Sequence, residues 1–130
     1  MKSLFISFLF AFTSLGAYAQ YSLIFCEDVN PEGVPKMPAS AFMVSDRGGV
    51  LRFMVRGDEE LNMDSIKYQL YFINQGGDEE FVTEFMQNVE PGWNYAWKEV
   101  VFFDPGNYRV KVIDSKDSYL TSANLTIKRP

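Results

Sequence analysis

The sequence predicts an all-β fold, a single antiparallel β-sandwich of about seven or eight strands. Three observations indicate it. After residue 20, short runs alternate apolar and polar side chains, as strands with one buried face do. Turn-forming Gly, Pro, Asn and Asp separate these runs at intervals of roughly 10–12 residues. No stretch after residue 20 indicates a helix more strongly than a strand.

The first two expected strands lie at residues 21–28 and 40–45. The turn sequence Asn-Pro-Glu-Gly at 30–33 ends the first of them. Pro35 and Pro38 are expected to keep the connection extended and non-helical, because proline restricts its own φ and the residue before it.

The runs at 50–56 and 65–74 alternate most cleanly, and the acidic stretch 57–64 connects them. Arg52 and Arg56 are expected on a solvent-exposed face of the first strand. The side chains expected to face the core are Leu51, Phe53, Val55, Ile66, Tyr68, Leu70 and Phe72.

Residues 80–89 fit the spacing of a helix as well as that of a strand, and their aromatic and β-branched content favours a strand. The remaining strands are expected near 100–103, 108–114 and 117–128. The inward side chains of the last two are expected to be Tyr108, Val110, Val112, Ala123, Leu125 and Ile127.

Residues 1–19 have the layout of a secretory signal peptide: a basic start at Lys2, an apolar stretch, and small residues at Ala17 and Ala19. The apolar stretch is shorter than the roughly 20 residues of a membrane span, and no transmembrane segment is expected in the mature chain. We therefore expect export to the periplasm or the cell surface, with residues 20–130 forming one β-sandwich domain.

Cys26 is the single cysteine, so no intramolecular disulfide can form. The bulky Phe25 before it argues against lipid attachment to the thiol. Because unpaired cysteine behaves as a small hydrophobic residue, Cys26 is expected to be a buried free thiol.

The composition excludes several functions. The formal net charge of −5 argues against nucleic acid or an anionic membrane as partner. The absence of histidine removes the usual general base and the commonest transition-metal ligand. No phosphate-binding or dinucleotide-binding glycine motif occurs. We expect no catalytic residues, no metal and no cofactor.

Two Asp-Glu-Glu sequences, at 58–60 and 78–80, are the remaining candidates for acid chemistry. Both fall in expected polar connections, where solvated carboxylates keep ordinary acidity and do not form a catalytic pair. A calcium site using these acids with Asp64 is disfavoured, because no Asp-x-Asp-x-Asp-Gly loop is present.

The stretch Asp-Pro-Gly-Asn-Tyr-Arg-Val-Lys-Val at 104–112 resembles the end of immunoglobulin-like and fibronectin-type domains. The resemblance implies a structural tyrosine corner, in which Asp104 and Gly106 form the turn and the Tyr108 hydroxyl bonds back to it. Val110 stands where antibody domains have their second cysteine. The whole chain is similar to small exported bacterial β-sandwich domains of uncharacterised role, which implies topology and export but no function.

Trp93, Tyr95 and Trp97 alternate along the chain and would share one face of a strand. Such a row either fills a core or forms a platform on which a ligand stacks, with Trp93 the residue expected to be most exposed. The next residue on that face is Glu99, and a buried carboxylate is costly. Either the strand has a bulge near Lys98, or the aromatic end lies outside the core.

Two functional hypotheses remain. The first is a non-catalytic exported module that binds another macromolecule, a protein or the cell-envelope surface. The alternative is a carbohydrate-binding module that uses the row Trp93, Tyr95 and Trp97. The oligomeric state and the strand order are left open by the sequence.

Overall fold

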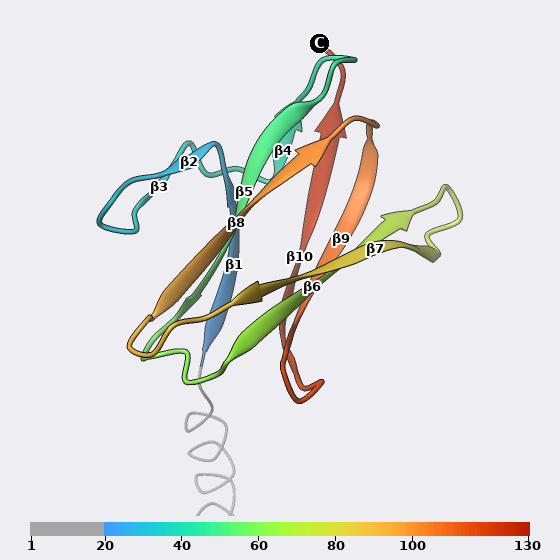
Figure 1. Cartoon of the computed structure of the whole chain (residues 1–130). Helices are drawn as coiled ribbons and strands as arrows, with labels where there is room; N and C mark the ends of the chain where they lie inside the picture. Colours follow the sequence, from blue (N-terminus) through green and yellow to red (C-terminus); the bar gives the residue numbers. More distant parts are fainter. Residues whose placement is uncertain (1–19) are drawn as a thin grey trace, which may run out of the picture.

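The computed structural model describes residues 20–130, so the expected signal peptide at 1–19 lies outside the described residues. The described chain consists of ten strands and contains no helix (Figure 1). The strands are β1 (Tyr21–Cys26), β2 (Asp28–Val29), β3 (Pro35–Lys36), β4 (Ala41–Met43), β5 (Gly49–Gly57), β6 (Ser65–Ile73), β7 (Glu79–Asn88), β8 (Tyr95–Phe102), β9 (Gly106–Asp114) and β10 (Tyr119–Lys128).

Two sheets form a sandwich, which confirms the all-β prediction. One sheet has the order β1-β5-β8, and the other has the order β4-β10-β9-β6-β7. All pairs are antiparallel except β4 with β10, which run parallel. The N-terminal part of the chain thus contributes β1 to the first sheet and β4 to the second. The short β2–β3 hairpin lies between β1 and β4 along the chain.

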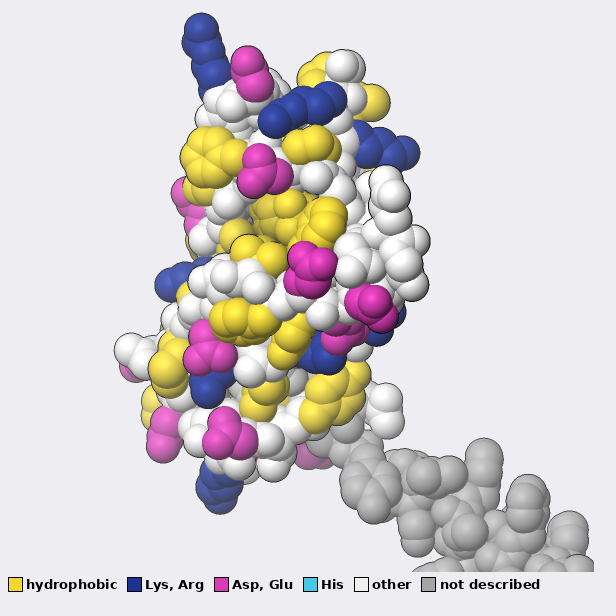
Figure 2. All heavy atoms as spheres, turned by 90° about the vertical axis from the view of Figure 1, so that its right-hand side faces the viewer, with side chains coloured by type: hydrophobic (Ala, Val, Ile, Leu, Met, Phe, Trp, Pro, Cys, Tyr) yellow, Lys and Arg dark blue, Asp and Glu magenta, His cyan; other side chains and the backbone are white. Residues whose placement is uncertain are grey.

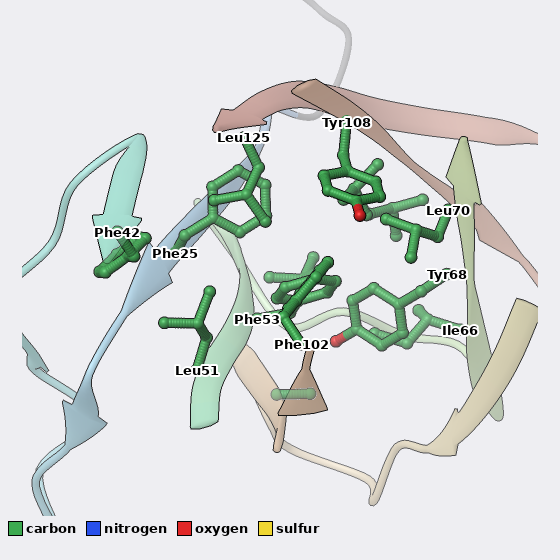
Figure 3. Packing of buried hydrophobic residues seen from close by; sticks show 14 of the residues in the cluster. Phe25, Phe42, Leu51, Phe53, Ile66, Tyr68, Leu70, Phe102, Tyr108 and Leu125 are labelled. Atoms are coloured by element: carbon green, nitrogen blue, oxygen red, sulfur yellow. The ribbon is translucent and has the colours of Figure 1, made fainter. Parts of the chain in front are cut away.

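Aromatic side chains from both sheets meet at Phe53, in the middle of the core (Figure 3). Its ring is fully buried, and ring centroids lie 5.0 Å away at Phe25 and 5.9 Å away at Tyr68. Phe102 contributes a further ring at 6.0 Å. Side chains from β1, β5, β6 and β8 therefore share one contact region, which stabilises both sheets against each other.

The expected inward faces of β5, β6, β9 and β10 are confirmed. Leu51, Phe53 and Val55 are buried on β5, and Tyr108, Val110 and Val112 are buried on β9. Phe72 and Ala123 pack against the core while remaining half-buried.

The expected solvent-exposed face of β5 is corrected by the structure, because Met54 on that face is fully buried. The chain after β1 is also not simply extended: it forms the β2–β3 hairpin, whose turn is held by Asn30. The Asn30 side-chain oxygen accepts hydrogen bonds from the N–H groups of Glu32 at 3.0 Å and Val34 at 2.9 Å. This hairpin covers Met54 with Val29.

Residues 79–88 form the strand β7, as predicted, with one irregularity in the pairing to β6. The register shifts between Leu70 and Tyr71, which leaves Val82 as an extra residue on β7. As a result Phe85 stacks on Tyr68 in the core at 5.2 Å, while Phe81 contacts Tyr71 on the outer face at 5.7 Å.

Tyr108 is buried, and its hydroxyl donates a hydrogen bond to the main-chain oxygen of Asp104 at 2.9 Å. Burial, and secondarily the Asp104 charge, raises the pKa of Tyr108. Gly106 begins β9 with a positive φ of 150°, and a Cβ there would overlap the Phe72 ring. The turn before β9 is thus constrained twice, by the hydrogen bond from Tyr108 to Asp104 and by the close packing of Gly106 against Phe72.

Glu79 lies on β7 and not in a solvated connection, which corrects the expectation for the second Asp-Glu-Glu sequence. Its carboxylate accepts hydrogen bonds from Lys111 at 2.8 Å and from Arg109 at 2.7 Å. The hydrogen bond from Lys111 is the main reason that the pKa of Glu79 is lowered.

Figure 2 views the side that carries the β6–β7 hairpin, where hydrophobic side chains lie among charged ones.

Truncating the central ring should destabilise the whole domain. Phe53→Ala removes contacts to both sheets, so the free energy of unfolding should fall by about 3–5 kcal/mol. The exposed Phe103 is the matched control, and Phe103→Ala should change stability by less than about 1 kcal/mol. Urea denaturation followed by circular dichroism measures both values; equal losses in the two variants would contradict the assignment of the core.

Candidate functional site

The pairing of β8 with β5 runs without a register shift, and it decides which side chains of β8 face the core. Ala96 and Phe102 are buried, and Val100 packs against the same core. The bulge that would have placed the aromatic row in the core is therefore absent from β8. Glu99 faces outward instead and forms an ion pair with Arg52 on β5 at 3.3 Å.

Both tryptophans of the row are at the surface. Trp93 is 41% exposed and Trp97 is 38% exposed. Trp97 lies on β8, whereas Trp93 precedes the strand in the turn after β7. The main chain of Trp93 is held by two hydrogen bonds, one from Leu61 N–H at 2.7 Å and one to the Glu90 carbonyl at 3.2 Å.

Tyr95, between the two tryptophans, is half-buried under the β2–β3 hairpin. It packs against a small cluster formed by Cys26, Val29 and Met54, separate from the main core. Gly33 has a φ of 80°, and its main chain lies so close to the Tyr95 ring that a Cβ would overlap it. The row therefore consists of two exposed indoles with a half-buried tyrosine between them.

Two arginines of β5 fix the hairpin in this position. Arg52 donates a hydrogen bond to the main-chain oxygen of Glu27 at 2.6 Å, and Arg56 donates one to that of Gly33. The Arg52 guanidinium also lies 5.9 Å from the centroid of the Trp97 ring, a cation–π contact. Trp97 is thus held in its orientation by a charge on the same sheet.

A hollow of about 460 Å³ lies beside the exposed indoles. It is lined by Gln87, Gly92, Trp93, Asn94, Tyr95, Ala96 and Trp97. The Gln87 side chain has both polar ends engaged: its amide donates to the Trp97 carbonyl, and its oxygen accepts from the Tyr68 hydroxyl at 2.8 Å. We define this hollow as the aromatic groove.

A second hollow of about 280 Å³ lies farther along β8. It is mainly apolar, and the residues that line it are Leu70, Val82, Thr83, Phe85, Val100, Val101, Phe102, Phe103, Asp104 and Tyr108. Sequence reasoning missed this site, because it depends on how far the edges of β7 and β8 stand apart. We define it as the apolar groove.

Cys26 is fully buried beneath the hairpin, and burial raises the pKa of its thiol. Within residues 20–130, no cluster of three or more His, Cys, Asp and Glu side chains is arranged to hold a metal ion. The acids Asp58, Glu59 and Glu60 are all exposed. The part of the chain that the structure describes also has no helix of the length and hydropathy needed to cross a bilayer.

Gly33→Ala should loosen the hairpin, since it adds a Cβ at a positive φ and against the Tyr95 ring. The expected result is faster reaction of Cys26 with a chromogenic disulfide reagent. Gly77 also has a positive φ, 86°, but an added Cβ there meets no atom within 4 Å. Gly77→Ala is therefore the matched control, and equal thiol reactivity in the two variants would contradict the covering role of the hairpin.

Comparisons with known proteins establish the fold. No family model matches the chain, and no curated protein matches it. Among solved structures, an immunoglobulin-like protein from Pseudomonas aeruginosa superposes with a TM-score of 0.50 at 10% sequence identity. The match covers 86% of this chain and 93% of that one. The described domain accordingly has an immunoglobulin-like β-sandwich fold.

Proposed function

We propose that this protein is a non-catalytic module, exported after removal of residues 1–19, that binds a partner protein through the aromatic groove. The observation that carries the proposal is the exposure of Trp93 and Trp97 at 41% and 38% beside a hollow of about 460 Å³. Tryptophan is enriched among the residues that contribute most to protein–protein affinity, because its large ring can be desolvated at little entropic cost.

The way both tryptophan residues are held supports this function. Trp93 is bonded through its main chain to Leu61 and Glu90, and Trp97 is on a strand with Arg52 against its ring. Side chains that are ordered before binding lose less conformational entropy on association. The Trp97 ring and the main chain that carries Trp93 are thus held in place before a partner binds.

Carbohydrate binding is the second candidate, favoured by the same pair of exposed indoles, on which sugar rings could stack. Sugar hydroxyls also require hydrogen-bond partners in the site. Gln87 already uses its amide and its oxygen within the domain, and Tyr95 is covered by the hairpin. Of the side chains that line the groove, Asn94 is the exposed amide left to serve this role. We therefore place protein binding first.

The proposal includes no chemical step. A histidine-dependent triad cannot form, because the sequence has no histidine. The carboxylates in the polar connections are exposed, and Glu79 is engaged by Arg109 and Lys111 on the outer face of the other sheet. General acid catalysis in the aromatic groove would require a carboxyl group there with a raised pKa.

Replacing either tryptophan should weaken binding without unfolding the domain. Trp93→Ala and Trp97→Ala are expected to weaken capture of the partner by the mature domain about tenfold or more, as loss of an anchor residue does. Tyr119→Ala is the matched control, because Tyr119 is 63% exposed on β10 of the other sheet. The measurement is affinity capture from envelope and secreted fractions, then titration of the captured protein by calorimetry, with circular dichroism to verify folding.

Retention on a polysaccharide column that disappears in both tryptophan variants would establish the carbohydrate candidate instead. Undiminished binding of every ligand by the two folded tryptophan variants would contradict the proposed function.

A further inference from the structure

Strand β8 is an edge strand whose second side is open. Among the described strands it pairs with β5 alone, and β7 of the opposite sheet lies next along the chain without pairing to it. In Figure 1 the two strands leave the turn at 89–94 and diverge. A sandwich edge of this kind presents backbone N–H and C=O groups that no neighbouring strand satisfies.

The direction of these groups follows from two hydrogen bonds. The Asn94 carbonyl accepts from Gly57 N–H on the β5 side, while the Trp97 carbonyl accepts from the Gln87 side chain on the opposite side. Main-chain groups of an antiparallel strand alternate between its two neighbours. The residues of β8 that turn their main-chain groups to the open edge are therefore Tyr95, Trp97, Glu99 and Val101.

Both grooves lie along this same edge. The aromatic groove is lined by residues 92–97, and the apolar groove by residues 100–104. β7 closes each of them from the other sheet, with Gln87 in the first and Val82, Thr83 and Phe85 in the second. Figure 2, seen from the side toward which the two strands diverge, shows a hollow with hydrophobic side chains at its floor. The space between the sheets is thus incompletely filled along the edge of β8.

Lys98 lies between the two grooves, on the face of β8 that carries Ala96 and Phe102. It is half-buried, and it has no ion pair or hydrogen bond with any residue in 20–130. A cationic group in a partly desolvated position is stabilised by an anionic partner. The edge therefore combines unsatisfied main-chain groups, apolar space and one unmatched positive charge.

We propose that the open edge of β8 binds an extended segment of the partner protein, which adds to the three-stranded sheet as a fourth strand. This inference rests on the proposed function and specifies how the partner protein binds. Alternate side chains of the added strand point between the sheets, opposite Ala96, Lys98, Val100 and Phe102. The segment accordingly carries an acidic residue opposite Lys98, with apolar residues two positions away on either side.

An extended peptide fits this edge better than other occupants do. A helix has its main-chain groups bonded internally, and a sugar or lipid offers no repeating N–H and C=O groups at strand spacing. A second copy is disfavoured, because antiparallel self-pairing centred on β8 places Lys98 against Lys98 or Glu99 against Glu99. The chain also carries a net charge of −5, which repels a second copy.

Gln87 has a defined part in this mode. In the free domain its amide donates a hydrogen bond to the Trp97 carbonyl, which would otherwise accept one from a main-chain N–H of the added strand. The Gln87 oxygen remains bonded to the Tyr68 hydroxyl at 2.8 Å. The side chain thus satisfies one group of the open edge until the partner strand replaces it.

The test uses two synthetic peptides of the same length, in which valine alternates with threonine and one central valine is replaced by glutamate or by lysine. Calorimetric titration of the mature domain should show saturable binding, with the glutamate peptide bound about tenfold more tightly. Lys98→Glu should reverse this preference. Lys116→Glu makes the same charge change in the exposed β9–β10 turn and should leave the preference intact.

Val101→Pro tests the main-chain contribution. It removes an N–H that faces the open edge, while the hydrogen bonds between β5 and β8 remain. The variant should keep the wild-type circular dichroism spectrum and lose binding of both peptides. Absence of saturable peptide binding, or affinities unchanged by both Val101→Pro and Lys98→Glu, would overturn strand addition. If the Trp97→Ala variant still lost its partner in that case, the proposed function would stand and this mode of binding would be wrong.

Discussion

The uninterrupted ladder between β5 and β8 is the constraint on which the rest of the structure depends. Because no bulge shifts its register, Ala96, Val100 and Phe102 pack into the core and Trp97 is turned to the surface. The same alternation points the main-chain groups of every second residue away from β5. One pairing thus sets the composition of the core, the exposure of the indole and the open edge at the same time.

The two faces of the three-stranded sheet are covered by different parts of the chain. Its inner face is buried by the five-stranded sheet, and part of its outer face is covered by the β2–β3 hairpin over Cys26 and Met54. Arg52 links these regions, since it bonds to the hairpin at Glu27 and contacts both Glu99 and Trp97. The hairpin packs against Tyr95 of the aromatic row and leaves Trp93 and Trp97 exposed.

The buried side chains could be predicted from the sequence where polar and apolar residues alternate strictly. In β5 and β9 the arginines and lysines mark one face, so the buried positions of Phe53 and Val110 could be predicted. β8 offers no such contrast, because Trp97 and Val101 face outward while Val100 and Phe102 face inward. The β2–β3 hairpin was missed for a related reason: its contacts with Met54 and Tyr95 are long-range and leave no local period. The extra residue Val82 and the spacing of the two sheet edges are likewise properties of the assembled sandwich.

Hydrogen–deuterium exchange of the individual amides of β8, followed by NMR on a protein comprising residues 20–130, is the most direct test of this account. An edge strand paired on one side has alternating protection. The amides of Trp97, Glu99 and Val101 should exchange rapidly, while those of Lys98, Val100 and Phe102 exchange slowly. Uniform slow exchange along the whole strand would show that the second edge is already paired, and it would contradict the account.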